Sequence, residues 1–209
     1  MAIGPFIRQL LGSFERPVSE IYRAIFVDLL ELARKIKDRV PAENILEIGC
    51  GEGALTEYLA KIYPQAHLTG IDITPRVGRM FQGDLNRVTF QQQLIKDFVA
   101  QNKSCFDLVV VSDVLHHVPW EMHQEFLIDS AKALKSGGCL VLKDWESRST
   151  PIHLLCYLAD RYITGDRVQY KTLDELRTLI KTVFGEECID KEIRIQPWSN
   201  NIVFFVQIQ

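Results

Sequence analysis

The chain has 209 residues, of which 47% are hydrophobic and 24% are charged. A chain of this length and composition can bury roughly 70% of its unfolded surface in one core, which excludes an intrinsically disordered protein. Its formal charge is −3, from 24 Lys and Arg against 27 Asp and Glu. No long block of one sign is present, so the sequence lacks the basic surface that is typical of proteins that bind nucleic acid.

The sequence also disfavours a membrane protein. No apolar run approaches the ~20 residues that cross a bilayer. The first ten residues lack the basic start and continuous apolar stretch of a signal peptide. We therefore expect a cytoplasmic protein without a membrane partner. The five cysteines are never spaced as CxxC, which predicts reduced thiols in the core and argues against structural zinc.

Short apolar runs alternate with amphipathic stretches, which is the pattern of βαβ units, so the predicted fold class is α/β. The predicted strands are Asn44 to Ile48, His67 to Asp72, Val88 to Gln92, Phe106 to Ser112, Gly138 to Lys143, Cys188 to Ile195 and Asn201 to Gln207. The predicted helices between them are Ala54 to Lys61, Arg76 to Phe81, Leu94 to Gln101, Glu121 to Leu134 and Leu173 to Val183. Short connections favour one domain over residues 1–209.

Two segments fall outside this alternation. Residues 1–40 contain an amphipathic helix, Val18 to Lys37, with apolar residues at helical spacing. Residues 145–171 follow the fifth strand and contain a second helix, with Leu155 and Leu158 in its apolar stripe. Each apolar face needs a surface to cover, so we predict that both segments are lids over the site.

The second of these helices also has a polar stripe. His153, Tyr157 and Arg161 recur at intervals of four residues, opposite the apolar stripe. Such a stripe on a surface helix is usually solvated. We keep it as a candidate contact for a substrate.

The most informative stretch is ILEIGCGEG, residues 45–53, a buried strand that runs into a glycine-rich turn and then a helix. Gly49, Gly51 and Gly53 lack a Cβ, so backbone amides can approach a ligand there. The helix N-terminus offers partial positive charge to an anionic group. Cys50 is expected to contribute through its backbone. The spacing is GxGxG rather than the GxGxxG of dinucleotide sites.

Two acids define the ligand further. Glu47 lies two residues before Gly49, where it would repel a pyrophosphate but suit a positively charged amine. Asp72 ends the second predicted strand, where a carboxylate reaches both hydroxyls of a ribose. Ile73 follows at the same strand end. A ligand with a ribose, an amine and a carboxylate, and with no required phosphate, fits S-adenosyl-L-methionine.

These motifs together resemble the class I S-adenosylmethionine-dependent methyltransferases over roughly residues 40–209. ILEIGCGEG resembles the first motif of that family, GIDI its ribose loop, FDLVVVSDVLHHV its fourth-strand signature and LKSGGCLVLKD its passage into the fifth strand. The resemblance implies a Rossmann-like sheet of seven strands with the last strand antiparallel. It also implies methyl transfer from S-adenosyl-L-methionine, bound across the carboxyl ends of the first strands.

The third strand departs from the family pattern. Many members have an Asp there that binds the adenine amino group, whereas residues 90–94 read FQQQL. A glutamine amide oxygen can accept the same hydrogen bond. We assign this role to Gln93, with Gln92 as the alternative and Leu94 packing on the ring. Ser112, at the end of the fourth strand, completes the predicted cofactor contacts.

The candidate catalytic residues follow the fourth and fifth strands. The resemblance places the end of the fourth strand beside the sulfonium, so His117 could orient or deprotonate an acceptor. Asp144 could accept a proton from a hydroxyl or amine. A divalent metal on Asp113, His116 and His117 is an alternative, similar to certain quinone-pathway O-methyltransferases. Most relatives with the LHH sequence use no metal, and we expect none here.

The acceptor is not specified by these motifs. The chain lacks a basic surface and an NPPY-type tetrapeptide after the fourth strand, which disfavours nucleic-acid and amide acceptors. A small molecule remains, weakly favoured as aromatic by Trp120, Trp145, Tyr157 and Tyr162. We predict methyl transfer to an O, N or C nucleophile of a small acceptor. The alternative is a non-catalytic module of the same fold that binds S-adenosylmethionine or a partner; a dehydrogenase is disfavoured by the glycine spacing.

Overall fold

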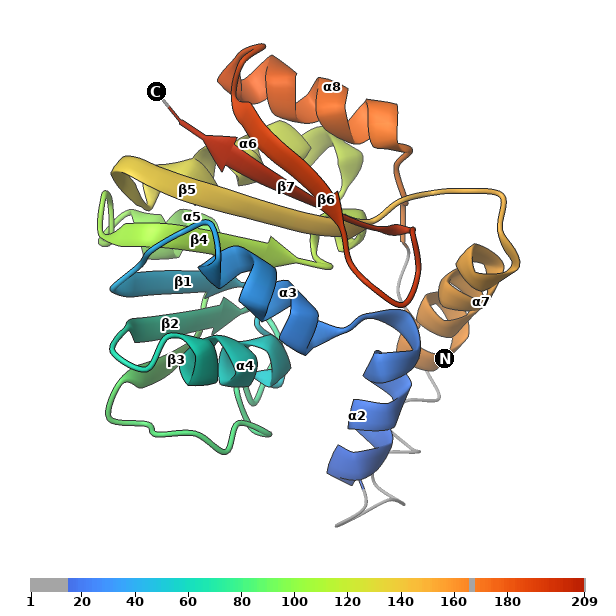
Figure 1. Ribbon diagram of the computed structural model, residues 1–209, viewed down its shortest axis with the longest axis horizontal. Helices are drawn as coiled ribbons and strands as arrows, with labels where there is room; N and C mark the ends of the chain where they lie inside the picture. Colours follow the sequence, from blue (N-terminus) through green and yellow to red (C-terminus); the bar gives the residue numbers. More distant parts are fainter. Residues whose placement is uncertain (1–14, 166–167, 209) are drawn as a thin grey trace.

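The computed structural model describes residues 15–165 and 168–208, which form a seven-stranded sheet in the order β3-β2-β1-β4-β5-β7-β6 (Figure 1). The strands are β1 (Asn44–Ile48), β2 (His67–Asp72), β3 (Val88–Gln92), β4 (Phe106–Ser112), β5 (Leu134–Trp145), β6 (Ile189–Arg194) and β7 (Asn201–Gln207). Strands β1 to β5 pair in parallel, and β7 is antiparallel to β5. The predicted fold class and the antiparallel last strand are confirmed.

Helices cover both faces of this sheet, with α3 and α4 in front of it in Figure 1 and α5 and α6 behind. The helices are α2 (Glu15–Phe26), α3 (Leu29–Lys37), α4 (Ala54–Ile62), α5 (Ile95–Val99), α6 (His123–Lys132), α7 (Pro151–Ala159) and α8 (Leu173–Phe184). Short helical turns are η2 (Leu115–His117), η3 (Trp120–Met122) and the π-helical η4 (Asp160–Thr164).

The central strand β4 shows why its sequence is a continuous apolar run. Val109 and Val111 pack with α5, α6 and α8, whereas Leu108 and Val110 pack with α3 and α4. Side chains alternate between the two faces of a strand. Because both faces are covered, both sets are apolar, as in other parallel sheets.

The N-terminal helix is broken, whereas the sequence predicts one helix over Val18 to Lys37. Asp28 ends the first part and caps α3, accepting a hydrogen bond from the Glu31 amide at 2.8 Å. In α3 the apolar stripe is buried, but in α2 Ile21 and Ile25 are 67% and 45% exposed. Only the second half of the predicted stripe therefore covers a described surface.

The predicted helix over Arg76 to Phe81 is wrong. The segment forms turns, with left-handed φ values at Arg76 (63°) and Gly78 (68°). Its amides bind the glycine-rich loop instead: Gly78 donates to the Gly51 carbonyl at 2.9 Å and Met80 to the Glu52 carbonyl at 3.0 Å. These long-range bonds replace the hydrogen bonds that a helix would make within the segment.

Strand β5 is longer at both ends than the predicted Gly138 to Lys143. Helix α6 ends at Lys132, and the strand starts at Leu134 with an irregular register opposite β4. At its other end the strand continues because Asp144 pairs with Ile202 and Trp145 with Asn201 of β7. Asp144 therefore lies in the strand rather than in a loop after it.

The inserted helix α7 lies beyond the end of the sheet (Figure 1). Cys156 and Ala159 of this helix are buried, but its larger apolar side chains are not: Leu154, Leu155 and Leu158 are exposed, as is Tyr162 of the following η4. The prediction that this stripe packs on another surface does not hold for the residues that the structure describes.

The cysteines and the helices also bear on the predicted thiols and the predicted absence of a membrane span. All five cysteines are free; four are buried as predicted, whereas Cys105 is exposed. Within residues 15–165 and 168–208, no helix combines the length and apolar character that crossing a bilayer requires.

Candidate active site

The glycine-rich loop joins β1 to α4 at the carboxyl end of the sheet. Gly49, Gly51 and Gly53 all have left-handed φ values, of 73°, 52° and 89°. A Cβ on Gly49 would lie 2.2 Å from the Val114 side chain, whereas one on Gly51 would meet no protein atom within 4 Å. Gly49 thus permits close packing against the segment after β4. Gly51 borders open space that a ligand can occupy.

Asp72 braces this loop from the end of β2. Its Oδ2 accepts the Gly51 amide at 2.8 Å, and its Oδ1 accepts both the amide and the hydroxyl of Thr74 at 2.8 Å. One lone pair on Oδ2 remains for a ribose hydroxyl, and the Thr74 hydroxyl can rotate towards another. The ribose contact predicted for Asp72 is compatible with this arrangement.

An apolar edge follows β2 and β3. Ile73 and Leu94 are 65% and 55% exposed although both are large and apolar. The Gln93 amide donates to the Asp72 carbonyl at 2.9 Å, and the Gln92 side chain donates to the Ile73 carbonyl at 3.1 Å. This Gln92 bond uses its amide nitrogen and leaves its side-chain oxygen as an acceptor, so the adenine contact of Gln93, with Gln92 as the alternative, stays a prediction. Exposed apolar side chains beside the ribose position suit an adenine ring.

Glu47 lies beneath the loop rather than on its surface. Its carboxyl is buried and accepts the Thr56 hydroxyl at 2.5 Å. Burial raises the pKa of Glu47 to about 8, a shift that the Thr56 hydrogen bond opposes and the negative charge of Asp72 increases. The free protein therefore holds Glu47 protonated at neutral pH. Its predicted contact with an amine requires loss of this proton.

Cys50 and the start of α4 complete the loop. The Cys50 amide donates to the Ile71 carbonyl at 3.1 Å, and burial raises the pKa of the Cys50 thiol, so the thiol is not a nucleophile. Gly53 is the N-cap of α4 and offers no side chain to its free amides. These amides suit a carboxylate. The loop, Asp72 and the apolar edge together fit S-adenosyl-L-methionine.

Helix α2 reaches the same loop from the N-terminal side. Arg23 pairs with Glu52 at 3.1 Å, and Arg16 pairs with Glu57 of α4 at 3.1 Å. A hollow of about 580 Å³ lies between α2, α3 and the outer side of α4. This hollow is separate from the predicted cofactor site at the strand ends.

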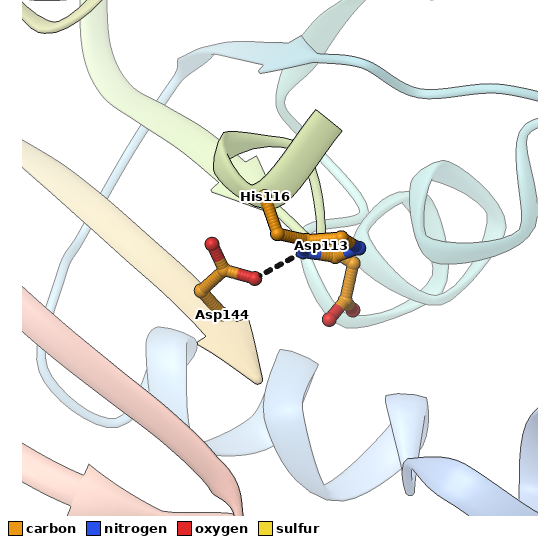
Figure 2. A group of neighbouring side chains, drawn as sticks. All are labelled: Asp113, His116 and Asp144. Atoms are coloured by element: carbon orange, nitrogen blue, oxygen red, sulfur yellow. Dashed lines mark hydrogen bonds and ion pairs between the residues drawn. The ribbon is translucent and has the colours of Figure 1, made fainter. Parts of the chain in front are cut away.

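His116 and Asp144 form a buried pair at the ends of β4 and β5 (Figure 2). The His116 Nδ1 and the Asp144 Oδ1 are 2.5 Å apart, and the Trp145 amide donates to the same oxygen at 2.8 Å. His117, which the sequence analysis favours as the base, is exposed, and its ring lies 4.2 Å from that of His116. The structure therefore pairs the predicted Asp144 with a different histidine.

The two partners stabilise each other's charge. Burial lowers the pKa of the His116 imidazole, but the charge and hydrogen bond of Asp144 outweigh this and raise it above the ordinary value. Burial raises the pKa of Asp144, but His116 outweighs this and holds that pKa below its ordinary value. In the neutral imidazole the carboxylate favours the proton on Nδ1, which leaves Nε2 as a proton acceptor.

A second ion pair lies beside the first. Lys143 is only 1% exposed, and its ammonium lies 2.5 and 2.6 Å from the two carboxylate oxygens of Asp113. Asp113 adopts a left-handed φ of 56° at the end of β4, which orients its carboxylate towards Lys143. The Ser112 hydroxyl lies 3.2 Å from the same carboxylate. The contact of Ser112 with the cofactor stays a prediction.

The donor set Asp113, His116 and Asp144 lies within 4.8 Å (Figure 2), and its composition is one that divalent metals accept. Two interactions oppose metal binding. The Lys143 ammonium already neutralises Asp113, and the Nδ1 of His116 is committed to Asp144. This set also differs from the metal alternative considered from the sequence, which used His117.

The sequence contains little signal for several of these partners. Thr74 and Lys143 were not identified, because their roles depend on which side chains the sheet brings together. His153, a predicted substrate contact, accepts the Trp145 indole N–H at 3.0 Å. Trp145 itself is buried against Phe26, so it is not an aromatic residue of the site's mouth.

Comparisons with known proteins agree with this geometry. Residues 45–138 match the family described as a methyltransferase domain. The match begins in β1 and ends in β5, so it contains the glycine-rich loop, Asp72 and His116. The centre of the sheet is therefore similar to a methyltransferase domain.

Several relatives are ubiquinone biosynthesis O-methyltransferases. The one from Xanthomonas campestris pv. campestris is 32% identical over 107 residues, covering 49% of this chain and 43% of the relative. The one from Xylella fastidiosa is 31% identical over 135 residues, covering 61% of this chain and 52% of the relative. The chain thus spans about half the length of these relatives.

Solved structures share the fold. The 1,6-didemethyltoxoflavin-N1-methyltransferase of Burkholderia thailandensis, solved with 1,6-didemethyltoxoflavin and S-adenosylhomocysteine, is similar at a TM-score of 0.66 and 16% identity, over 97% of this chain and 88% of that one. The pyocyanin biosynthetic protein PhzM is similar at a TM-score of 0.73 and 14% identity, over 94% of this chain and 58% of that one. The family match over residues 45–138 and the shared fold both agree with the class I S-adenosylmethionine-dependent methyltransferase resemblance that the motifs predict.

The ribose role of Asp72 can be tested by removing its charge. We expect Asp72→Asn to weaken S-adenosylhomocysteine binding at least tenfold, because hydrogen bonds to a charged group contribute about 1.5 to 3 kcal/mol. The asparagine oxygen can still accept the Gly51 amide and so keep the loop in place. Isothermal titration measures the affinity. Thr74→Val is the matched control for loss of the Thr74 hydroxyl contact, and normal affinity of folded Asp72→Asn would contradict the assignment.

The amine contact of Glu47 has a protonation signature. Glu47 is protonated at pH 7, because its pKa is about 8, whereas pairing with an ammonium requires the carboxylate. We therefore expect cofactor binding at pH 7 to release close to one proton, seen as a binding enthalpy that depends on the ionisation enthalpy of the buffer. Glu47→Gln should abolish this dependence. A buffer-independent enthalpy in the unmodified protein would place the amine elsewhere.

The metal question has a direct test. We expect exhaustive EDTA treatment to leave methyl transfer unchanged within twofold, because the Lys143 ammonium neutralises Asp113 and the Oδ1 of Asp144 already contacts both His116 and the Trp145 amide. Activity after dialysis into metal-free buffer, with and without added Mg²⁺ or Zn²⁺, measures this. Loss of turnover that one of these ions restores would overturn the expectation.

Proposed function

We propose that the protein is an S-adenosylmethionine-dependent methyltransferase that methylates a hydroxyl oxygen of a small molecule. The observation that carries the proposal is the buried His116–Asp144 pair next to the cofactor loop. Val114 packs against Gly49 of that loop, and His116 follows two residues later. This neighbourhood supports the proposal that His116 acts as a proton acceptor beside the bound cofactor.

The cofactor site supports the first half of this proposal. When bound, S-adenosyl-L-methionine supplies a methyl group on a positively charged sulfur, which is electrophilic without further activation. The protein therefore has to align the acceptor and exclude water. The loop amides, Asp72 and the edge of Ile73 and Leu94 hold the cofactor's parts in this proposal.

His116 and Asp144 have distinct roles in the proposed reaction. The Nε2 of His116 accepts the hydroxyl proton of the acceptor as its oxygen attacks, which increases the nucleophilicity of that oxygen. Asp144 holds the Nδ1 proton, selects the tautomer and stabilises the imidazolium that forms. From the sequence, Asp144 is a candidate to accept the acceptor's proton. In this proposal it orients the base instead.

The hydroxyl acceptor follows from chemistry and from the relatives' names. A weakly acidic hydroxyl needs a base at neutral pH, and a base with a raised pKa suits it. Two of the relatives described above are named ubiquinone biosynthesis O-methyltransferases, and this name specifies methyl transfer to oxygen. Trp120 and Tyr157 are exposed and favour an aromatic acceptor. Residues 1–40 and 145–171 remain proposed covers.

The alternative is a binding module of the same fold without turnover. The buried histidine–carboxylate pair argues against it, because such a pair costs desolvation that cofactor binding alone does not require. Release of S-adenosylhomocysteine with a panel of phenols and catechols separates the two. A pure binder is stabilised by the cofactor but releases no product with any acceptor.

The base can be identified by substitution and by pH. We expect His116→Ala to reduce kcat by about 10²- to 10⁴-fold, the usual contribution of a general base, and His117→Ala to have a much smaller effect. The value of kcat/KM should rise with pH as His116 loses its proton, with a midpoint above the ordinary value of about 6.5. Asp144→Asn should move that midpoint lower and reduce the rate.

Cofactor affinity provides the control for these variants. His116→Ala and Asp144→Asn should bind S-adenosylhomocysteine within about threefold of the unmodified protein, because neither side chain belongs to the proposed cofactor site. If His117→Ala instead causes the larger loss of kcat at unchanged affinity, the base is His117.

A further inference from the structure

Tyr170 touches both the base and the inserted segment. Its ring stacks on the His116 ring, with centroids 4.7 Å apart and planes inclined by 27°. Its hydroxyl donates to the Asp160 carboxylate at the start of η4 and lies 3.3 Å from the Cys156 sulfur of α7. The His153 ring packs edge-on against it, with centroids 5.2 Å apart. One side chain thus links three residues of the insertion to His116.

The backbone around Tyr170 is fixed to the same two strand ends. The Gln169 amide donates to the His116 carbonyl at 2.8 Å. The Lys171 carbonyl accepts the amide of Ser147, just after β5, at 2.7 Å. The position of the Tyr170 ring therefore follows the elements that carry His116 and Asp144.

Among residues 15–165 and 168–208, the side-chain contacts of helix α7 with the rest of the chain are mainly polar. Leu154, Leu155 and Leu158 are exposed, so α7 does not rest on a broad apolar contact. The Trp145–His153 bond anchors its start, and the Tyr170 hydroxyl holds its end through Asp160 and Cys156. A helix held by a few polar contacts can shift when one of them is lost.

The charges around His116 come from several elements. Asp144 of β5, Asp113 after β4 and Asp160 of η4 each raise the pKa of His116, while burial lowers it. The His117 ring lies beside it, 4.2 Å away, and Lys143 neutralises Asp113. Burial raises the pKa of the Tyr170 hydroxyl, so this group remains a neutral donor. Its contribution to the site is geometric.

We propose that Tyr170 is a positioning residue, which holds the His116 ring on Asp144 through its stacked ring and ties that position to α7 and η4 through its hydroxyl. This proposal rests on the proposed function, in which His116 is the base. When α7 and η4 close over the acceptor, the Asp160 contact brings the Tyr170 ring onto His116. When they open, the ring loses its anchor and the imidazole gains freedom to leave Asp144.

The first test needs no turnover. The ring protons of His116, observed by NMR in the free protein and assigned by their loss in His116→Ala, are shifted by the stacked Tyr170 ring. Tyr170→Ala removes the ring and defines the unstacked position. We expect Tyr170→Phe and Asp160→Ala, compared at a pH at which His116 is neutral in every variant, to move the His116 signals towards that position by at least a third of the difference. The hydroxyl does not touch His116, so a role in packing alone predicts no such movement.

A double variant tests whether the two contacts act together. Tyr170→Phe combined with Asp160→Ala should move the His116 signals no further than either change alone at that pH, because both changes remove the same hydrogen bond. Tyr162→Phe is the matched control: this tyrosine of η4 is 61% exposed, and its loss of a hydroxyl should leave the signals unchanged. Signals of folded Tyr170→Phe that superimpose on those of the unmodified protein would overturn the proposal.

The second test uses methyl transfer. We expect Tyr170→Ala and Tyr170→Phe to reduce kcat at least tenfold and threefold, respectively, with the affinity for S-adenosylhomocysteine unchanged within twofold. An unchanged kcat in a Tyr170→Ala protein that has lost the His116 shift would also overturn the proposal. If the unmodified protein shows no turnover with any acceptor, the proposed function fails, and the NMR test still decides whether Tyr170 positions His116.

Discussion

The close approach of Gly49 to Val114 sets the position of the cofactor loop relative to the residues that follow β4. A Cβ on Gly49 would lie 2.2 Å from Val114, so only glycine lets the cofactor loop pack against the segment that follows β4. That contact brings the loop amides and the His116–Asp144 pair to one corner of the sheet. Any larger residue would push the two apart and separate the proposed methyl donor from the base. A shift of about 1 Å in such an arrangement can cost 10²-fold in rate.

Adjacent residues of β5 supply both buried charges of this corner. Side chains alternate along a strand, so Lys143 reaches Asp113 after β4, while Asp144 reaches His116 in η2. Each buried charge has an opposite partner, which meets the requirement for placing ions in a protein interior. The irregular backbone of Asp113 is consistent with the same pairing. Its left-handed φ orients the carboxylate towards Lys143, whose side chain is 1% exposed.

Much of the fold could be predicted, because the sheet's strands are apolar runs between clear breaks and the glycine motif marks the turn after β1. Features set by distant contacts could not. The break at Asp28 is stabilised by a bond from its amide to Gln196, and the turns over 76–81 by bonds to the glycine loop. Likewise, sequence alone does not determine which of two consecutive histidines faces inwards. The η2 turn buries His116 and exposes His117, and pairing with β7 keeps Asp144 inside the strand.

The joint between α2 and α3 is attached to the loop between β6 and β7, near the other end of the chain. Gln196 donates to Glu31, Trp198 donates to the Ile25 carbonyl and Asn201 donates to the Phe26 carbonyl, at sequence separations of 165 to 175 residues. A ribosome delivers these partners last, at about 5 to 20 residues per second. For about 8 to 35 seconds of synthesis the joint between α2 and α3 therefore lacks these hydrogen-bond partners, although α3 can already pack on β1 and α4. The orientation of α2 relative to α3 is consequently fixed late, when the loop between β6 and β7 has been made.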